Sequence, residues 1–148
     1  MAITQGLTTV FKLNLLNGAE NFTGTSPYVY KIALYNANAS LDNTTTAYTS
    51  NNEITGTGYT AGGNTLTVST TPTSGTNSYG VVTAYISFTN TEWTSASFTA
   101  RGALIYNSSK SNKSVAVLDF GGDKTVSDGT FTVQFPAADA NSAIVRIS

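Results

Sequence analysis

Apolar and polar residues alternate with a period of two along most of the chain, which is typical of strands with one buried face. Residues 130–135 show this most clearly, because phenylalanine and valine occupy the odd positions and threonine and glutamine the even ones. Other segments rich in aromatic and β-branched residues are 28–35, 65–69, 81–88, 98–106, 114–120 and 143–147. Short strands separated by turn residues predict an all-β, mainly antiparallel fold with a β-sandwich or jelly-roll-like arrangement.

The N-terminal segment has a different period. Phe11 and Leu15 belong to a set of apolar residues at helical spacing, which predicts a short helix. Thr4 is a suitable N-cap for this helix, and Gly18 is a suitable stop signal. The apolar residues within 11–15 also alternate, so a strand remains the alternative for this segment.

Turn-forming residues are concentrated in the first half of the chain. Residues 36–52 are rich in asparagine and threonine, 56–64 are rich in glycine, and 70–78 contain a proline and a glycine. We expect these stretches to form loops that project from the sandwich. No linker-like segment divides the 148 residues, so we interpret 1–148 as a single domain.

The polar surface is predicted to carry few charges. Charged residues make up 10% of the chain, and the polarity comes from 26 threonines, 16 serines and 14 asparagines. A surface of hydroxyls and amides can lie against a neutral partner without the cost of desolvating ions. The seven lysines and arginines are scattered, which argues against nucleic acid as a partner.

Several classes of site are excluded by composition. The chain contains no cysteine and no histidine, so disulfides and thiolate or imidazole metal sites cannot form. We expect no cofactor and no metal ion. No run of 18 apolar residues is present, so no membrane-spanning helix is predicted, and no signal peptide is visible.

Candidate catalytic groups are sparse, and we predict that the protein is not an enzyme. Histidine, the usual base of a nucleophilic triad, is absent. A glycosidase needs two facing carboxylates, for which Glu53 and Glu92 are one conceivable pair without a supporting motif. The aspartates and glycines of 119–128 match no EF-hand spacing, so we interpret this stretch as a turn between two strands.

Arg101 is the most informative charged residue, because it lies in the otherwise apolar segment 98–106. A charge in such a strand needs a partner, and Asp119 or Glu92 can supply one. We predict a structural ion pair between Arg101 and Asp119 that fixes the strand register. A ligand contact is the alternative role.

Aromatic residues provide candidate contact sites. Tyr48, Tyr59 and Tyr79 lie in predicted loops, and Trp93 is the single tryptophan. Tyrosine and tryptophan are enriched at protein interfaces and also stack on sugars. The sequence does not distinguish a protein partner from a glycan at these positions.

Several segments resemble a family of small bacteriophage virion structural proteins. These segments are 1–5, 30–35, 56–63, 101–107, 116–125, 131–139 and 143–147. The resemblance implies a component of the virus particle, made in the bacterial host cytoplasm. It carries over no catalytic or binding residue.

A capsid decoration (cement) protein that stabilises the major capsid shell fits this resemblance and the neutral composition best. The partner is then the major capsid protein, and a homo-oligomer is implied, a trimer if it occupies threefold positions. We predict that 1–22 forms either an arm that docks on another subunit or a helix that covers one end of the sandwich, with Leu7, Phe11 and Leu15 as interface residues. The alternative is a tail or fibre adhesin that contacts host glycan.

Overall fold

The computed structural model describes residues 2–23 and 28–148, so the first residue of the predicted segment 1–22 lies outside the described part. The elements in chain order are β1 (Gly6–Leu7), α1 (Thr9–Leu16), β2 (Tyr30–Tyr35), β3 (Asn64–Leu66), β4 (Val68–Thr76), β5 (Val82–Phe88), β6 (Thr91–Asn107), β7 (Lys113–Val133) and β8 (Val145–Ile147). The strand pairs between these elements are antiparallel. The predicted all-β class with a short N-terminal helix is confirmed.

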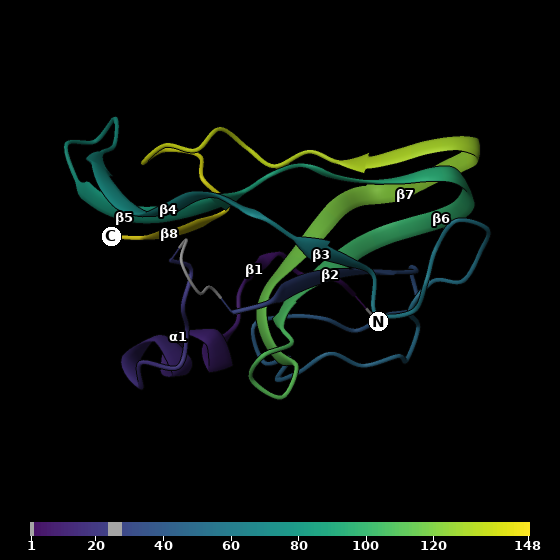
Figure 1. The fold of residues 1–148 in the computed structure, drawn as a ribbon, viewed down its shortest axis with the longest axis horizontal. Helices are drawn as coiled ribbons and strands as arrows, with labels where there is room; N and C mark the ends of the chain where they lie inside the picture. The colour runs from purple at the N-terminus through teal and green to yellow at the C-terminus, as the bar shows by residue number, and fades with distance from the viewer. Residues whose placement is uncertain (1, 24–27) are drawn as a thin grey trace.

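The strands form two sheets (Figure 1). The larger sheet has the strand order β1-β7-β6-β2-β3, and the smaller sheet has the order β4-β5-β8. Side chains of both sheets meet in one core, in which Ile32 and Leu34 of β2 cluster with Ile86 and Phe88 of β5 and with Val145 of β8. The arrangement is sandwich-like, and a jelly-roll connectivity stays a prediction.

A long hairpin of β6 and β7 forms the centre of the larger sheet (Figure 1). Its pairing includes several register shifts. The prediction of a turn within 119–128 is wrong, because β7 runs through this stretch. Gly121 and Asp128 take φ values of 76° and 48° there, so these turn-forming residues produce irregularities within a strand and do not reverse the chain.

The predicted loop at 70–78 is also largely a strand. Residues 68–76 form β4 and pair with β5, with register shifts before Thr73. Proline is tolerated because β4 is an edge strand of the smaller sheet, where one row of backbone groups needs no partner. Only the tight turn that follows, around Asn77 and Gly80, reverses the chain.

The second face of the larger sheet is covered by the chain that follows β2. Ala33 and Tyr35 alternate with the core residues of β2 and therefore face away from the smaller sheet. Ala39 and Leu41 pack on this face and are almost fully buried. The predicted stretches 36–52 and 56–64 do lack strands up to Asn64, but the prediction that 36–52 projects from the sandwich is wrong, because Ala39 and Leu41 hold it against the sheet.

The helix α1 begins later than predicted. Thr8, and not Thr4, is the N-cap, because its Oγ1 accepts a hydrogen bond from the N–H of Phe11 at 3.3 Å. Gly18 follows the helix with a φ of 69°, as expected for a stop signal. Phe11 is fully buried against Phe22, with ring centroids 6.1 Å apart. The N-terminal segment is therefore fastened to the body of the protein and does not project as an arm.

Candidate binding surface at one end of the sandwich

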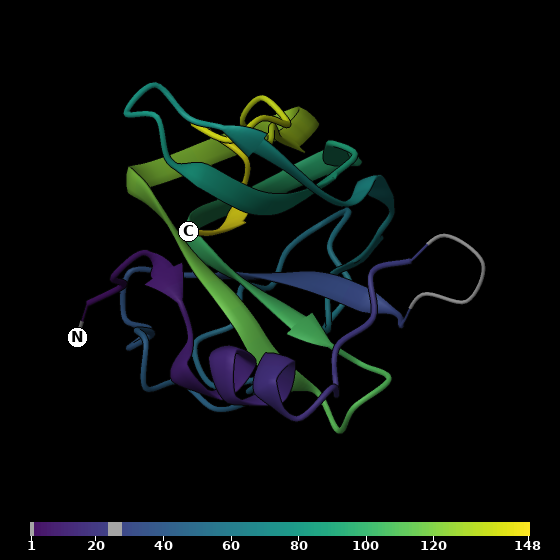
Figure 2. The same ribbon diagram turned by 90° about the vertical axis from the view of Figure 1, so that its left-hand side faces the viewer.

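Large apolar side chains are exposed mainly at one end of the protein. Those among the described residues are Leu13, Leu16, Val29, Tyr79, Val81, Val82 and Ile147. All but Val29 belong to α1, to the β4–β5 turn and the start of β5, or to β8. These elements lie in the left-hand part of Figure 1, and Figure 2 views that side with α1 at the bottom, the β4–β5 turn at the top and β8 between them. We call the six residues other than Val29 the apolar end.

The helix contributes to this end with the face opposite to the one that the sequence indicated. Phe11 is buried and Leu15 packs half-buried on the core, so the stripe at helical spacing faces inward. Leu13 and Leu16 fall outside this stripe, and they are 53% and 87% exposed. Phe11 does not reach the surface, so its prediction as an interface residue is wrong. Leu7 is half-buried and lines a cleft.

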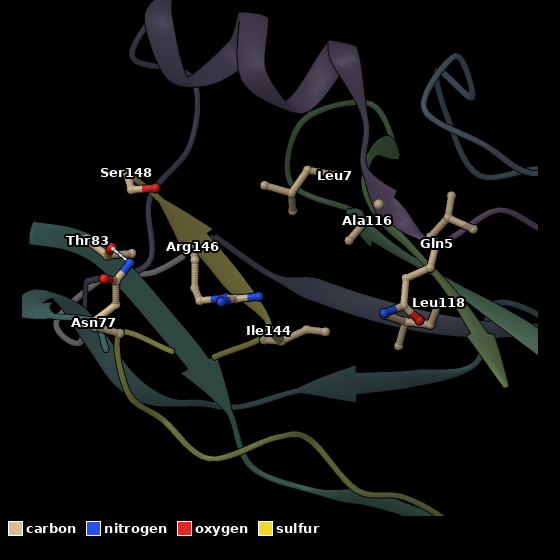
Figure 3. A pocket seen from close by; sticks show the side chains of 12 residues that line it. Gln5, Leu7, Asn77, Thr83, Ala116, Leu118, Ile144, Arg146 and Ser148 are labelled. Carbon is tan, nitrogen blue, oxygen red and sulfur yellow. Dashed lines mark hydrogen bonds between the residues drawn. The ribbon is translucent and has the colours of Figure 1, made fainter. Parts of the chain in front are cut away.

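This cleft, of about 450 Å³, opens between the two sheets. Gln5, Leu7 and Leu118 lie on the side of the larger sheet, and Ile144 and Arg146 lie on the side of the smaller sheet (Figure 3). The cleft is bordered by β1 and β8, each of which is the last strand of its sheet. Edge strands carry backbone N–H and C=O groups without a sheet partner, so the cleft has a strongly polar rim along an apolar floor.

The predicted contact residues Tyr48 and Tyr59 are half-buried, and both bind an internal carboxylate. Glu53 accepts hydrogen bonds from the two tyrosine hydroxyls, each at 2.6 Å, and from the N–H of Gly62 at 2.7 Å. The hydroxyl of Tyr59 also accepts a hydrogen bond from the N–H of Leu34 in β2 at 2.9 Å. These bonds fasten the segment between β2 and β3 to the larger sheet, which is a structural role.

The same cluster extends to Tyr106. Its ring stacks on Tyr48 with centroids 4.9 Å apart, and its hydroxyl donates to the carbonyl of Gly62 at 2.7 Å. Burial, with a contribution from the nearby Glu53 carboxylate, raises the pKa of Tyr106 to about 12. Burial and the hydrogen bonds to Glu53 also raise the pKa values of Tyr48 and Tyr59. These hydroxyls therefore remain neutral donors well above neutral pH.

Trp93 and Tyr79 have opposite environments. Trp93 is only 4% exposed and packs against Tyr59, Phe98 and Phe131. Its indole N–H has no hydrogen-bond partner among the described residues. The prediction that Trp93 is a surface contact is therefore wrong. Tyr79 is 90% exposed in the β4–β5 turn, and its contact with a partner stays a prediction.

Arg101 forms an ion pair, but its partner is not Asp119. Its guanidinium lies 3.2 Å from the carboxylate of Asp123 on the neighbouring strand. Asp119 is the register partner of Gly102, the residue next to Arg101 on β6. Its carboxylate accepts a hydrogen bond from the N–H of Gly121 at 2.8 Å. Both partners of the observed pair are substantially exposed, which places Arg101 on the solvent side of the strand.

A second carboxylate, Glu20, links the chain after α1 to β2 and β6. It accepts hydrogen bonds from the hydroxyl of Tyr30 at 2.7 Å, from the side-chain amide of Asn107 at 2.9 Å and from that of Asn14 at 3.5 Å. Burial raises the pKa of Glu20, and the hydrogen bonds oppose this effect. The ionised form is therefore less favourable in the folded protein than in the unfolded chain.

Replacing Glu20 by glutamine is expected to raise the free energy of unfolding relative to the native protein at pH 7. Because its pKa is raised, Glu20 binds a proton at a higher pH in the folded protein than in the unfolded chain. The native protein therefore gains stability as the pH falls toward 4.5. Glutamine keeps an acceptor for Tyr30 and does not titrate. Urea unfolding of both proteins between pH 7 and pH 4 should show the advantage of Glu20→Gln shrinking with pH. An advantage that grows toward pH 4 contradicts this account.

The described residues hold no cluster of three or more acidic side chains with the geometry of a metal site. None of the helical structure in the described part is long and apolar enough to cross a membrane. Comparisons of the chain with protein-family models, curated proteins and solved structures gave no significant match.

Proposed function

We propose that the protein is a non-enzymatic structural component of a bacteriophage particle, a capsid decoration protein that binds the shell through its apolar end. The apolar end is the observation that carries this proposal. Exposed apolar side chains that gather on one region of a protein mark a contact surface. The partner is the major capsid protein, to which many copies attach, as a homo-oligomer such as a trimer at threefold positions.

The chemistry of the surface supports attachment to a neutral partner. The six residues of the apolar end comprise three leucine or isoleucine side chains, two valines and one tyrosine, with no charge among them. Burying each large apolar side chain contributes roughly 1.5–3 kcal/mol, so a modest contact by each copy is sufficient when a shell offers many equivalent positions.

The half-buried carboxylates support a structural rather than a catalytic role. Glu53 and Glu20 each accept three hydrogen bonds from groups of the protein itself. A general acid or base needs to reach a substrate, whereas these two groups join loops to sheets. The phage context comes from the resemblance of segments such as 101–107 and 116–125 to small virion proteins.

The number of copies in a particle tests the proposal. Purified virions of the phage that encodes the chain should contain hundreds of copies by quantitative mass spectrometry. Particles that lack the gene should lose capsid stability toward heat or chelation while they still adsorb to the host. About a dozen copies with loss of adsorption would favour the adhesin alternative, and absence from the particle would overturn both.

A further inference from the structure

We infer that the cleft between β1 and β8 receives an extended peptide segment of the shell protein, which adds as a strand to the open edge of β8. This inference rests on the proposed function and names the part of the partner that the protein recognises. An added strand supplies backbone hydrogen bonds to an edge and places alternate side chains in a groove.

The hydrogen-bond register of the smaller sheet leaves Arg146 with outward-facing backbone groups. In the turn between β4 and β5, the N–H of Asn77 donates to the carbonyl of Val81, which fixes the alternation of bonds along β5. Thr83 and Tyr85 then bond to β4, while Ala84 and Ile86 bond to β8 through residues 147 and 145. The N–H and C=O of Arg146, opposite Tyr85, consequently face the open side.

The edge across the cleft is open in the same way. The N–H of Thr8 donates to the carbonyl of Val115, so Thr8 and Gly6 direct their backbone groups toward β7. Leu7 lies between them and directs its N–H and C=O away from β7. Leu7 and Arg146 both line the cleft. Two strand edges whose backbone groups at Leu7 and Arg146 face away from their sheets therefore border one groove, where an extended chain can bind.

The lining of the cleft indicates what the segment carries. Ala116, Leu118 and Ile144 provide an apolar floor, and Arg146 has the only charged side chain among the described residues that line it (Figure 3). The guanidinium is held by the backbone carbonyls of Ala143 and Asn141, so it is already oriented. Charge complementarity thus favours small apolar residues with one carboxylate placed against Arg146.

Two variants of Arg146 distinguish the contribution of its backbone N–H to binding from that of its guanidinium. Arg146→Ala removes the guanidinium and keeps the outward N–H, whereas Arg146→Pro removes both. Proline is compatible with an edge strand whose N–H faces outward, and thermal unfolding of both variants checks that the fold is retained. Binding to shells purified from particles that lack the gene should weaken about tenfold further for proline than for alanine, because one backbone donor is lost. Equal binding by the two variants would overturn the inference.

Hydrogen exchange of the native protein locates the segment directly. In the shell-bound state, fragments that contain Leu7 and Arg146 should exchange more slowly than in the free protein, while the edge strand β3 should be unchanged. Normal binding without protection of Arg146 would overturn the inference and leave the proposed function intact. Failure of the native protein to bind shells at all would overturn the proposed function, and the inference with it.

Discussion

Replacement of Glu53 by alanine is expected to lower the free energy of unfolding by about 4 kcal/mol, since several hydrogen bonds to one charged acceptor are lost. The hydroxyls of Tyr48 and Tyr59 and the N–H of Gly62 all donate to this carboxylate. Without it, two half-buried hydroxyls and one backbone N–H lose their acceptor inside the structure. The segment between β2 and β3 should then detach from the sheet, which urea unfolding and limited proteolysis within 36–63 both measure.

Glu53→Gln is the matched control. Glutamine has the same shape and keeps one acceptor oxygen. Glu53→Gln should therefore lower the free energy of unfolding by roughly half as much as Glu53→Ala, about 2 kcal/mol. If the free energy of unfolding of Glu53→Ala lies within about 1 kcal/mol of the native value, the carboxylate does not hold this segment. The assignment of Tyr48 and Tyr59 to a structural role is then wrong.

A double substitution in the apolar end, Leu16→Asp with Val82→Asp, is expected to weaken binding to capsid shells by at least about 100-fold. The two side chains are 87% and 67% exposed, so their replacement leaves the core untouched. The variant loses roughly 1.5–3 kcal/mol of apolar burial at each site and must also desolvate two carboxylates on binding. Co-sedimentation with shells from particles that lack the gene measures the affinity.

Val29→Asp is the control for this substitution. Val29 is also an exposed large apolar residue, but it lies outside the apolar end. We expect its affinity to stay within about twofold of the native value, since surface substitutions away from a contact have small effects. Similar losses for Val29→Asp and for the double variant would show that added charge, and not the apolar end, controls binding. Unfolding midpoints of all proteins confirm that each remains folded.

The fold class could be predicted from the sequence because alternation and turn chemistry are local properties. The continuity of β7 could not, since Gly121 and Asp128 have the composition of a turn. The long pairing with β6 overrides this local preference, and the two residues adopt positive φ within the strand. The path of 36–63 depends on Ala39 and Leu41, whose burial requires a sheet face that local sequence does not reveal.

The candidate surface was only partly predictable for a related reason. Regular helical spacing identified Phe11 and Leu15, and a regular stripe is normally the buried one. The exposed residues Leu13 and Leu16 are the leucines that fall outside this stripe, and they were the available signal for a contact surface. The partner of Arg101 was misplaced because the register between β6 and β7 shifts near this residue, which brings Asp123 rather than Asp119 to its side chain.

A cryo-electron microscopy reconstruction of the phage particle tests the central claim most directly. The account predicts density for this protein on the capsid surface, with α1, the β4–β5 turn and β8 facing the shell and the apolar end buried. Density in which this end faces solvent while another face of the sandwich contacts the shell would contradict the account.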